Sequence, residues 1–156
     1  MPYSIPILIN DLTQYGLNPD SFVVSQDQVF IPCNSDSNFQ FRLSCQVTEK
    51  VILISTTRLI GSLETGSLPF YLQASDSCSG VKIFINPKDE LNRDNNWILE
   101  MGCDIFTETY TQEDFFLRLD LLFYNINKLL NLALDEEIIS INVLAQNPNS
   151  CTAEQV

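Results

Sequence analysis

The stretch that decides the fold is PFYLQASDSCSGVKIFINPKDE, which runs from Pro69 to Glu90. An aromatic segment leads into a polar loop, and the loop leads into the apolar alternation VKIFIN (81–86), which Pro87 ends. This order predicts a short helix over LPFYLQAS (68–75) and a strand over VKIFIN, joined by the polar link SDSCSG (75–80). Whether that link is an active site or only a joint between two elements depends on the rest of the chain.

Alternating apolar and polar residues predict further strands on both sides of this stretch. FVVSQDQVFIP (22–32) predicts two short strands around a polar turn, and NFQFRLSCQV (38–47) predicts a half-buried strand. VILISTTRLI (51–60) begins with apolar residues on both faces, as a central strand does, whereas SLETGSLPF (62–70) is expected to be a linker. NWILEMGCDIF (96–106) predicts another strand, with one apolar face made of Trp97, Leu99, Met101, Cys103 and Ile105.

Helical spacing predicts a helix near each end of the chain. Ser4 and Gly16 are the expected cap and stop of a first helix, and Thr111 is the expected N-cap of a long helix over 112–134. The long helix carries one apolar stripe, which predicts contact with a sheet: Phe115, Leu119, Leu122, Ile126, Leu129 and Ala133.

The apolar surface of the long helix extends beyond that stripe, through Leu117, Leu121 and Tyr124. A helix that lies on one sheet needs a narrower stripe. We therefore expect either that the helix is covered on two sides within the domain or that part of it meets another chain. Polar residues interrupt this surface and are expected to mark the solvent side: Asn125, Asn127, Lys128 and Asn131.

The order of elements predicts the fold class. A helix, about four strands, a short helix, two strands and a long helix indicate an α+β protein with a mainly antiparallel sheet and helices packed on it. We expect a single domain over residues 1–145 and a flexible C-terminal tail over 146–156. DEEIISINVLAQ (135–146) fits a short helix or a strand, and the sequence does not choose between them.

The charge balance argues against two classes of partner. Twenty acidic residues against eight basic ones give a net charge of −12, which disfavours nucleic acid and anionic membrane surfaces. The N-terminal residues lack the pattern of a signal peptide and no apolar run approaches the length of a membrane span, so we expect neither. The five cysteines form no CxxC motif and are odd in number, so we expect reduced thiols in a cytoplasmic protein.

Residues suited to catalysis are scarce. The chain has no histidine, which removes the commonest general base, the serine and cysteine triads and histidine-ligated zinc. Cys78 and the Glu100–Asp104 pair are the candidates for thiol or acid–base chemistry, and a structural role is expected for both. No glycine-rich phosphate loop, metal motif or cofactor motif is present, so we expect neither a metal nor a cofactor.

The chain resembles the type III secretion chaperone-like fold, a group that includes YbjN-like bacterial proteins. The resemblance is carried by LPFYLQASDSCSGVKIFIN (68–86), NWILEMGCDIF (96–106) and TQEDFFLRLDLLFYNINKLLNLAL (111–134). The family runs helix, three strands, helix, two strands, helix. Its short helix often ends in Asn, where this chain has Ser75.

The resemblance implies a non-enzymatic protein, commonly a homodimer, that holds another polypeptide on apolar surface. We therefore predict a chaperone-like or regulatory protein-binding module whose partner or dimer interface is formed by Phe70, Tyr71, Leu117, Leu121 and Tyr124. A small-molecule sensor domain and, with less support, a small enzyme that uses carboxylates or Cys78 remain the alternatives.

Overall fold

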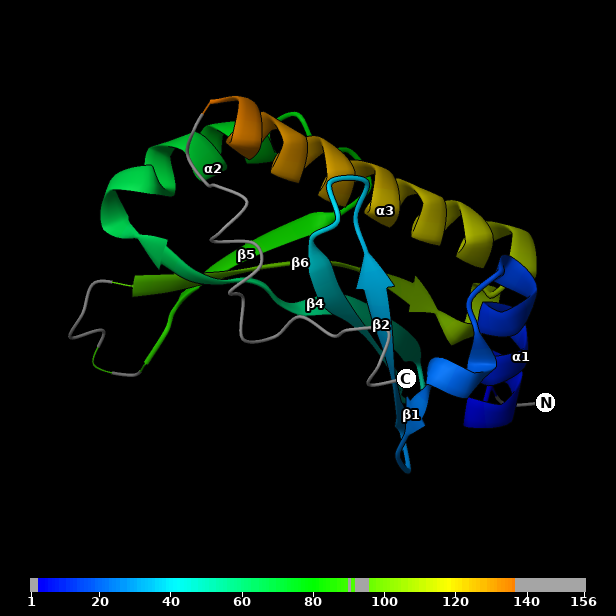
Figure 1. Ribbon diagram of the computed structural model, residues 1–156. Helices are drawn as coiled ribbons and strands as arrows, with labels where there is room; N and C mark the ends of the chain where they lie inside the picture. Colours follow the sequence, from blue (N-terminus) through cyan, green and yellow to red (C-terminus); the bar gives the residue numbers. More distant parts are fainter. Residues whose placement is uncertain (1–2, 90, 92–95, 137–156) are drawn as a thin grey trace.

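The fold is that of a computed structural model, which describes residues 3–89, 91 and 96–136. In this part of the chain, six strands form one open antiparallel sheet, accompanied by three α-helices (Figure 1). Short 3₁₀ turns precede β1, α2 and α3. The elements in chain order are α1 (Ile5–Tyr15), β1 (Val23–Val24), β2 (Gln28–Asn34), β3 (Gln40–Val47), β4 (Val51–Glu64), α2 (Leu68–Ser75), β5 (Lys82–Pro87), β6 (Asn96–Phe106) and α3 (Gln112–Asp135).

The strands lie side by side in the order β1-β2-β3-β4-β6-β5, and each pair of neighbours is antiparallel. The predicted α+β class, the antiparallel sheet and the order of elements are confirmed. The predicted boundary between residues 145 and 146 lies outside the described residues, as does most of the segment 135–146.

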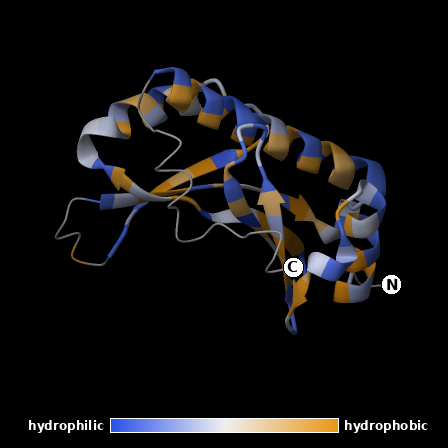
Figure 2. Cartoon of the chain, viewed as in Figure 1, coloured by the Kyte–Doolittle hydropathy of each residue, from blue (hydrophilic) through white to orange (hydrophobic). Residues whose placement is uncertain are grey.

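The core lies between one face of the sheet and the helices. In Figure 1, α3 runs across the sheet, with α1 near one end of it and α2 near the other. Figure 2 shows polar and apolar residues interleaved along α3 and the strands, as expected for elements with one buried side. All six residues of the predicted α3 stripe are buried: Phe115, Leu119, Leu122, Ile126, Leu129 and Ala133.

The two predicted helix caps differ in their contacts. Thr111 is the N-cap of α3, and its side chain accepts a hydrogen bond from the backbone N–H of Asp114 at 3.1 Å. Ser4 occupies the N-cap position of α1, but its side chain makes no capping hydrogen bond. Helix α1 ends at Tyr15, and its C-cap is Gly16, whose φ of 120° lies in the region that favours glycine.

Strand β4 is longer than predicted. It continues to Glu64, so the first part of the expected linker is strand. Its pairing with β6 shifts register after Thr56, where Arg58 adopts a φ of 51°. The irregularity changes which residues of β4 face the core. Before it the buried residues are even-numbered, and after it the odd-numbered Leu59, Gly61 and Leu63 are buried.

A buried carboxylate joins α1 to the start of α3. Asp11 is 5% exposed and accepts hydrogen bonds from Tyr3 Oη at 3.0 Å, from Gln112 Nε2 at 3.1 Å and from Tyr110 Oη. Burial raises the pKa of both tyrosine hydroxyls, and the hydrogen bonds to Asp11 add to the increase. The phenols therefore stay protonated and act as donors to the carboxylate.

Candidate functional site

An apolar strip lies on the outer flank of α3 and consists of Leu117, Leu121 and Tyr124, which we call the α3 flank. The spacing of four and three residues places the three side chains in one row along the helix. Leu117 is 55% exposed and Tyr124 is 63% exposed, whereas Leu121 between them is partly buried. Three of the five predicted interface residues therefore adjoin one another, two of them at the surface.

The remaining two predicted interface residues lie on α2 and are less available. Tyr71 is completely buried in the core, and Phe70 packs edge-on against it with 5.1 Å between ring centroids. A side chain without exposed surface has none to offer to a partner. Tyr71 is therefore a core residue in this fold, and its burial gives no support to the prediction that it lies at an interface.

The loop between α2 and β5 is held against α3. Asn125 Nδ2 donates a hydrogen bond to the carbonyl of Ser79 at 3.0 Å, and Lys128 Nζ donates one to the carbonyl of Ser77 at 2.9 Å. Gly80 has a φ of 79°, and a Cβ there would lie 3.0 Å from Leu121 Cδ1. Loop and α3 flank are thus in direct contact.

These contacts correct the expectation that the polar residues of the long helix mark its solvent side. Asn125 is only 2% exposed. Asn127 accepts a hydrogen bond from the backbone N–H of Asp36 at 2.8 Å, so it holds the turn between β2 and β3. Asn131 alone among the three asparagines is exposed. Asn125, Asn127 and Lys128 mark the places where loops meet the helix.

Cys78 belongs to the same loop and is partly buried. Its thiol contacts the carbonyl oxygen of Ala74 at 3.7 Å, at the end of α2. Partial burial raises the pKa of this thiol, although Lys128 and Ser77 act in the opposite direction. A protonated thiol is a weak nucleophile, so the environment of Cys78 supports a structural role for the α2–β5 loop more than a catalytic one.

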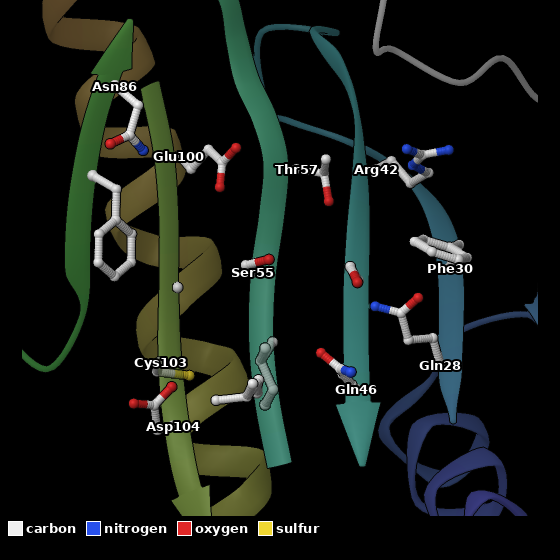
Figure 3. A pocket seen from close by; sticks show the side chains of 15 residues that line it. Gln28, Phe30, Arg42, Gln46, Ser55, Thr57, Asn86, Glu100, Cys103 and Asp104 are labelled. Carbon is white, nitrogen blue, oxygen red and sulfur yellow. The ribbon is translucent and has the colours of Figure 1, made fainter. Parts of the chain in front are cut away.

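The second candidate surface is the face of the sheet opposite the core, which we call the open face. Among the described residues, the helices pack on the other side. The open face holds a surface hollow of about 620 Å³, seen in Figure 3. Its lining includes Gln28, Phe30, Arg42, Ser44, Gln46, Leu53, Ser55, Thr57, Phe84, Asn86, Glu100, Gly102 and Asp104.

Small residues form the floor of this hollow. Strand pairing places Ser44 opposite Ser55 and Ser55 opposite Gly102, so three neighbouring strands carry minimal side chains in one row. A Cβ on residue 102 would lie 2.4 Å from the carbonyl oxygen of Ile54, a distance that real contacts do not reach. Glycine is therefore required there by the close approach of β4 and β6.

Charged groups stand on either side of the floor. The guanidinium of Arg42 lies over the ring of Phe30, 4.8 Å from its centroid. Neither Arg42 nor Glu100 takes part in an ion pair within the described residues, and Arg42 Nε is shielded from solvent without an acceptor there. Asp104, by contrast, pairs with Lys82 Nζ at 2.6 Å.

The carboxylates considered for acid–base chemistry thus have separate environments. Glu100 and Asp104 share the open face as predicted, with Gly102 between them on β6. Asp104 is engaged with Lys82 across the β5–β6 pair. A smaller hollow of about 390 Å³ lies beside this ion pair, where α3 contributes Asp114 and Arg118, 3.6 Å apart.

The open face was not singled out from the sequence. Alternation identifies Arg42, Ser44 and Glu100 as members of polar strand faces. It does not reveal that β3, β4 and β6 are neighbours, because β5 lies between β4 and β6 in the chain and outside them in the sheet. The register of the strands is what assembles the hollow.

Comparisons with family models, with curated proteins and with solved structures found no match to this chain. In the part of the chain that the structure describes, no helix has the length and apolar character needed to cross a membrane. The resemblance to the type III secretion chaperone-like fold stays a prediction.

Proposed function

We propose that this chain is a non-enzymatic protein-binding module that receives a partner polypeptide on the α3 flank. The observation that carries the proposal is the exposure of Leu117 and Tyr124 in one row with Leu121. Apolar residues at this spacing form the usual contact strip of a helix with another polypeptide. Covering such side chains removes apolar surface from water, at about 25 cal/mol for each Å².

The neighbourhood of the flank supports this mode of binding. Leu121 touches the loop that leads directly into β5, and β5 is an outer strand of the sheet. The side chains of β5 are only partly buried or exposed along its whole length. An outer strand carries free backbone groups, so a partner segment on the flank finds hydrogen-bonding groups beside it.

The chemistry of the chain supports binding over catalysis. The sequence contains no histidine, and Cys78 has a raised pKa in a loop that is tied to α3. Cys45, Cys78 and Cys103 are free thiols, as suits a reducing compartment. We therefore place the binding activity in the cytoplasm.

The test is affinity capture from the native cell with quantitative mass spectrometry. The double variant Leu117→Ser/Tyr124→Ser removes the exposed apolar groups and spares Leu121, which supports the loop. Val23→Ser/Val24→Ser is the matched control, because these valines are 61% and 49% exposed on β1, at the opposite edge of the sheet.

We expect the wild type and the control to recover the same stoichiometric partner, and the flank variant to recover at least tenfold less. A tenfold loss corresponds to about 1.4 kcal/mol of binding free energy. Equal recovery by the flank variant, or capture of no stoichiometric partner by the wild type, would contradict the proposal.

A further inference from the structure

The open face carries a charge pattern that is complementary to itself. Its side chains form three levels across β3, β4 and β6. Strand pairing gives the levels Gln46–Leu53–Asp104 and Ser44–Ser55–Gly102. Figure 3 shows Arg42, Thr57 and Glu100 at the next level along the same strands.

The positive and negative groups lie on opposite sides of β4. Arg42 is on β3 and Glu100 is on β6, so two strand spacings, roughly 10 Å, separate their backbones. Neither has an ion-pair partner within the described residues. The two groups do not pair with each other within one chain, and each lines a hollow in which an opposite charge would be stabilised.

A two-fold axis that runs parallel to β4, midway between two facing open faces, exchanges the two sides. It brings Arg42 of one copy over Glu100 of a second copy, and Gln46 over Asp104. Ser44 then faces Gly102, and the β4 residues on the axis face their own counterparts. Every such contact occurs twice, as in an isologous interface.

We propose that the open face is the docking surface for a second copy of this chain, with two reciprocal Arg42–Glu100 ion pairs across a two-fold axis along β4. The charges select this arrangement. An axis across the strands would instead bring Glu100 towards Asp104 of the other copy, and like charges repel.

The remaining side chains fit the same contact. Leu53 is 39% exposed and Phe84 is 45% exposed, so both gain from burial. The hydroxyl groups of Ser44, Ser55 and Thr57 line the two facing hollows and suit bridging water. Two stacked sheets are about 10 Å apart, which matches the reach of the rim side chains.

The size of the face sets the expected strength. Five strands and three levels cover on the order of 500 Å² on each copy, below the roughly 800 Å² of a standard interface. Each copy also carries a net charge of −12, and this long-range repulsion opposes association. The dimer is therefore expected to be weak, with a Kd on the order of 10 µM.

The experiment is sedimentation velocity over about 1 to 200 µM protein in about 0.15 M salt, where the Debye length is about 8 Å. The variants are Arg42→Glu and Glu100→Arg, measured separately and as an equimolar mixture. Either variant alone places like charges against each other twice. In the mixture, residues 42 and 100 of the two different copies again carry opposite charges.

We expect the wild type to dimerise, each single variant to dimerise at least tenfold more weakly, and the mixture to recover dimers. Recovery on mixing requires two folded partners, so it separates an interface from a folding defect. Lys88→Glu is the charge-matched control, because this exposed lysine follows β5 outside the hollow.

Three results would overturn the inference: a wild-type monomer at the highest concentration, a dimer that neither single reversal weakens, or single variants that stay monomeric when mixed. The inference does not depend on the proposed function, since the α3 flank belongs to the helix layer on the other side of the sheet. Leu117→Ser/Tyr124→Ser is expected to leave this dimer unchanged.

Discussion

Tyr71 is buried and Tyr110 is partly buried, and their hydroxyl groups differ in their hydrogen bonding. Tyr110 donates its hydrogen bond to the carboxylate of Asp11. Tyr71 is fully buried, and its hydroxyl has no hydrogen-bond partner among the described residues. A buried donor without a partner costs about 1–3 kcal/mol, whereas a hydrogen bond to a charged group contributes about 1.5–3 kcal/mol.

Removing each hydroxyl should therefore change stability in opposite directions. We expect Tyr71→Phe to raise the free energy of unfolding by about 1 kcal/mol, and Tyr110→Phe to lower it by about 2 kcal/mol. Urea denaturation of the two variants beside the wild type measures both changes. A loss of stability in Tyr71→Phe would show that its hydroxyl is satisfied in solution.

At the scale of elements, α3 organises the fold through polar side chains as well as apolar ones. Asn127 holds the β2–β3 turn, while Asn125 and Lys128 hold the α2–β5 loop. Asn125 also donates to the carbonyl of Leu121 at 2.8 Å, so its amide group bridges helix and loop. The helix thereby fixes two connections that are far apart in the sequence.

The contribution of this bridge can be measured on one helix. Asn125→Ala should lower the free energy of unfolding by about 2 kcal/mol, because the hydrogen bonds that the buried amide group donates to the carbonyls of Ser79 and Leu121 are lost. Asn131→Ala is the matched control, since Asn131 is exposed and alanine favours the helix by about 0.5 kcal/mol. Equal effects of the two substitutions in chemical denaturation would reject the bridge.

At the scale of the whole molecule, buried thiols make stability depend on alkaline pH. Burial raises the pKa of Cys103 to about 11 and that of Cys45 further. Above about pH 9, the unfolded chain releases these protons and the folded chain keeps them. The contribution of the protonated Cys103 thiol to the free energy of unfolding is therefore complete below about pH 9 and is lost as the pH rises towards about 11.

We expect the free energy of unfolding to fall by about 1 kcal/mol per pH unit for each buried thiol between pH 9 and 10. Cys103→Ala should reduce the slope of this decline by the contribution of one thiol, about 1 kcal/mol per pH unit, whatever its effect on stability at neutral pH. Cys78→Ala is the comparison, because Lys128 opposes the shift at this partly buried thiol. Urea denaturation at a series of pH values gives the slopes, and indistinguishable slopes would refute the assignment.

Strand and helix positions were predictable because their signals are local. The alternation in residues 96–106 and the spacing of Phe115, Leu119 and Leu122 report burial directly, since backbone geometry fixes which side chains share a face. The register shift in β4 was not predictable. Arg58 has no turn chemistry of its own, and the irregularity is seen only in the pairing of β4 with β6.

The candidate surfaces divide in the same way. Leu117 and Tyr124 were identified correctly as surplus apolar residues, because the helical period gives their direction. The burial of Tyr71 and Asn125 was not predicted, since it depends on α2 and the α2–β5 loop meeting distant elements. The type of a side chain predicts its preference for water, but the residues packed around it decide whether it is exposed to solvent.

The sequence by itself determined the elements, the α+β class and the scarcity of catalytic side chains. Residue types are read directly from the chain, and the periodicity that predicts helices and strands extends over only a few neighbouring residues. Only the tertiary structure decided that PFYLQASDSCSGVKIFINPKDE contains a joint held by α3. It alone brought Arg42 and Glu100 to either side of one hollow. Strand order and register join residues more than fifty positions apart, and no local pattern carries that information.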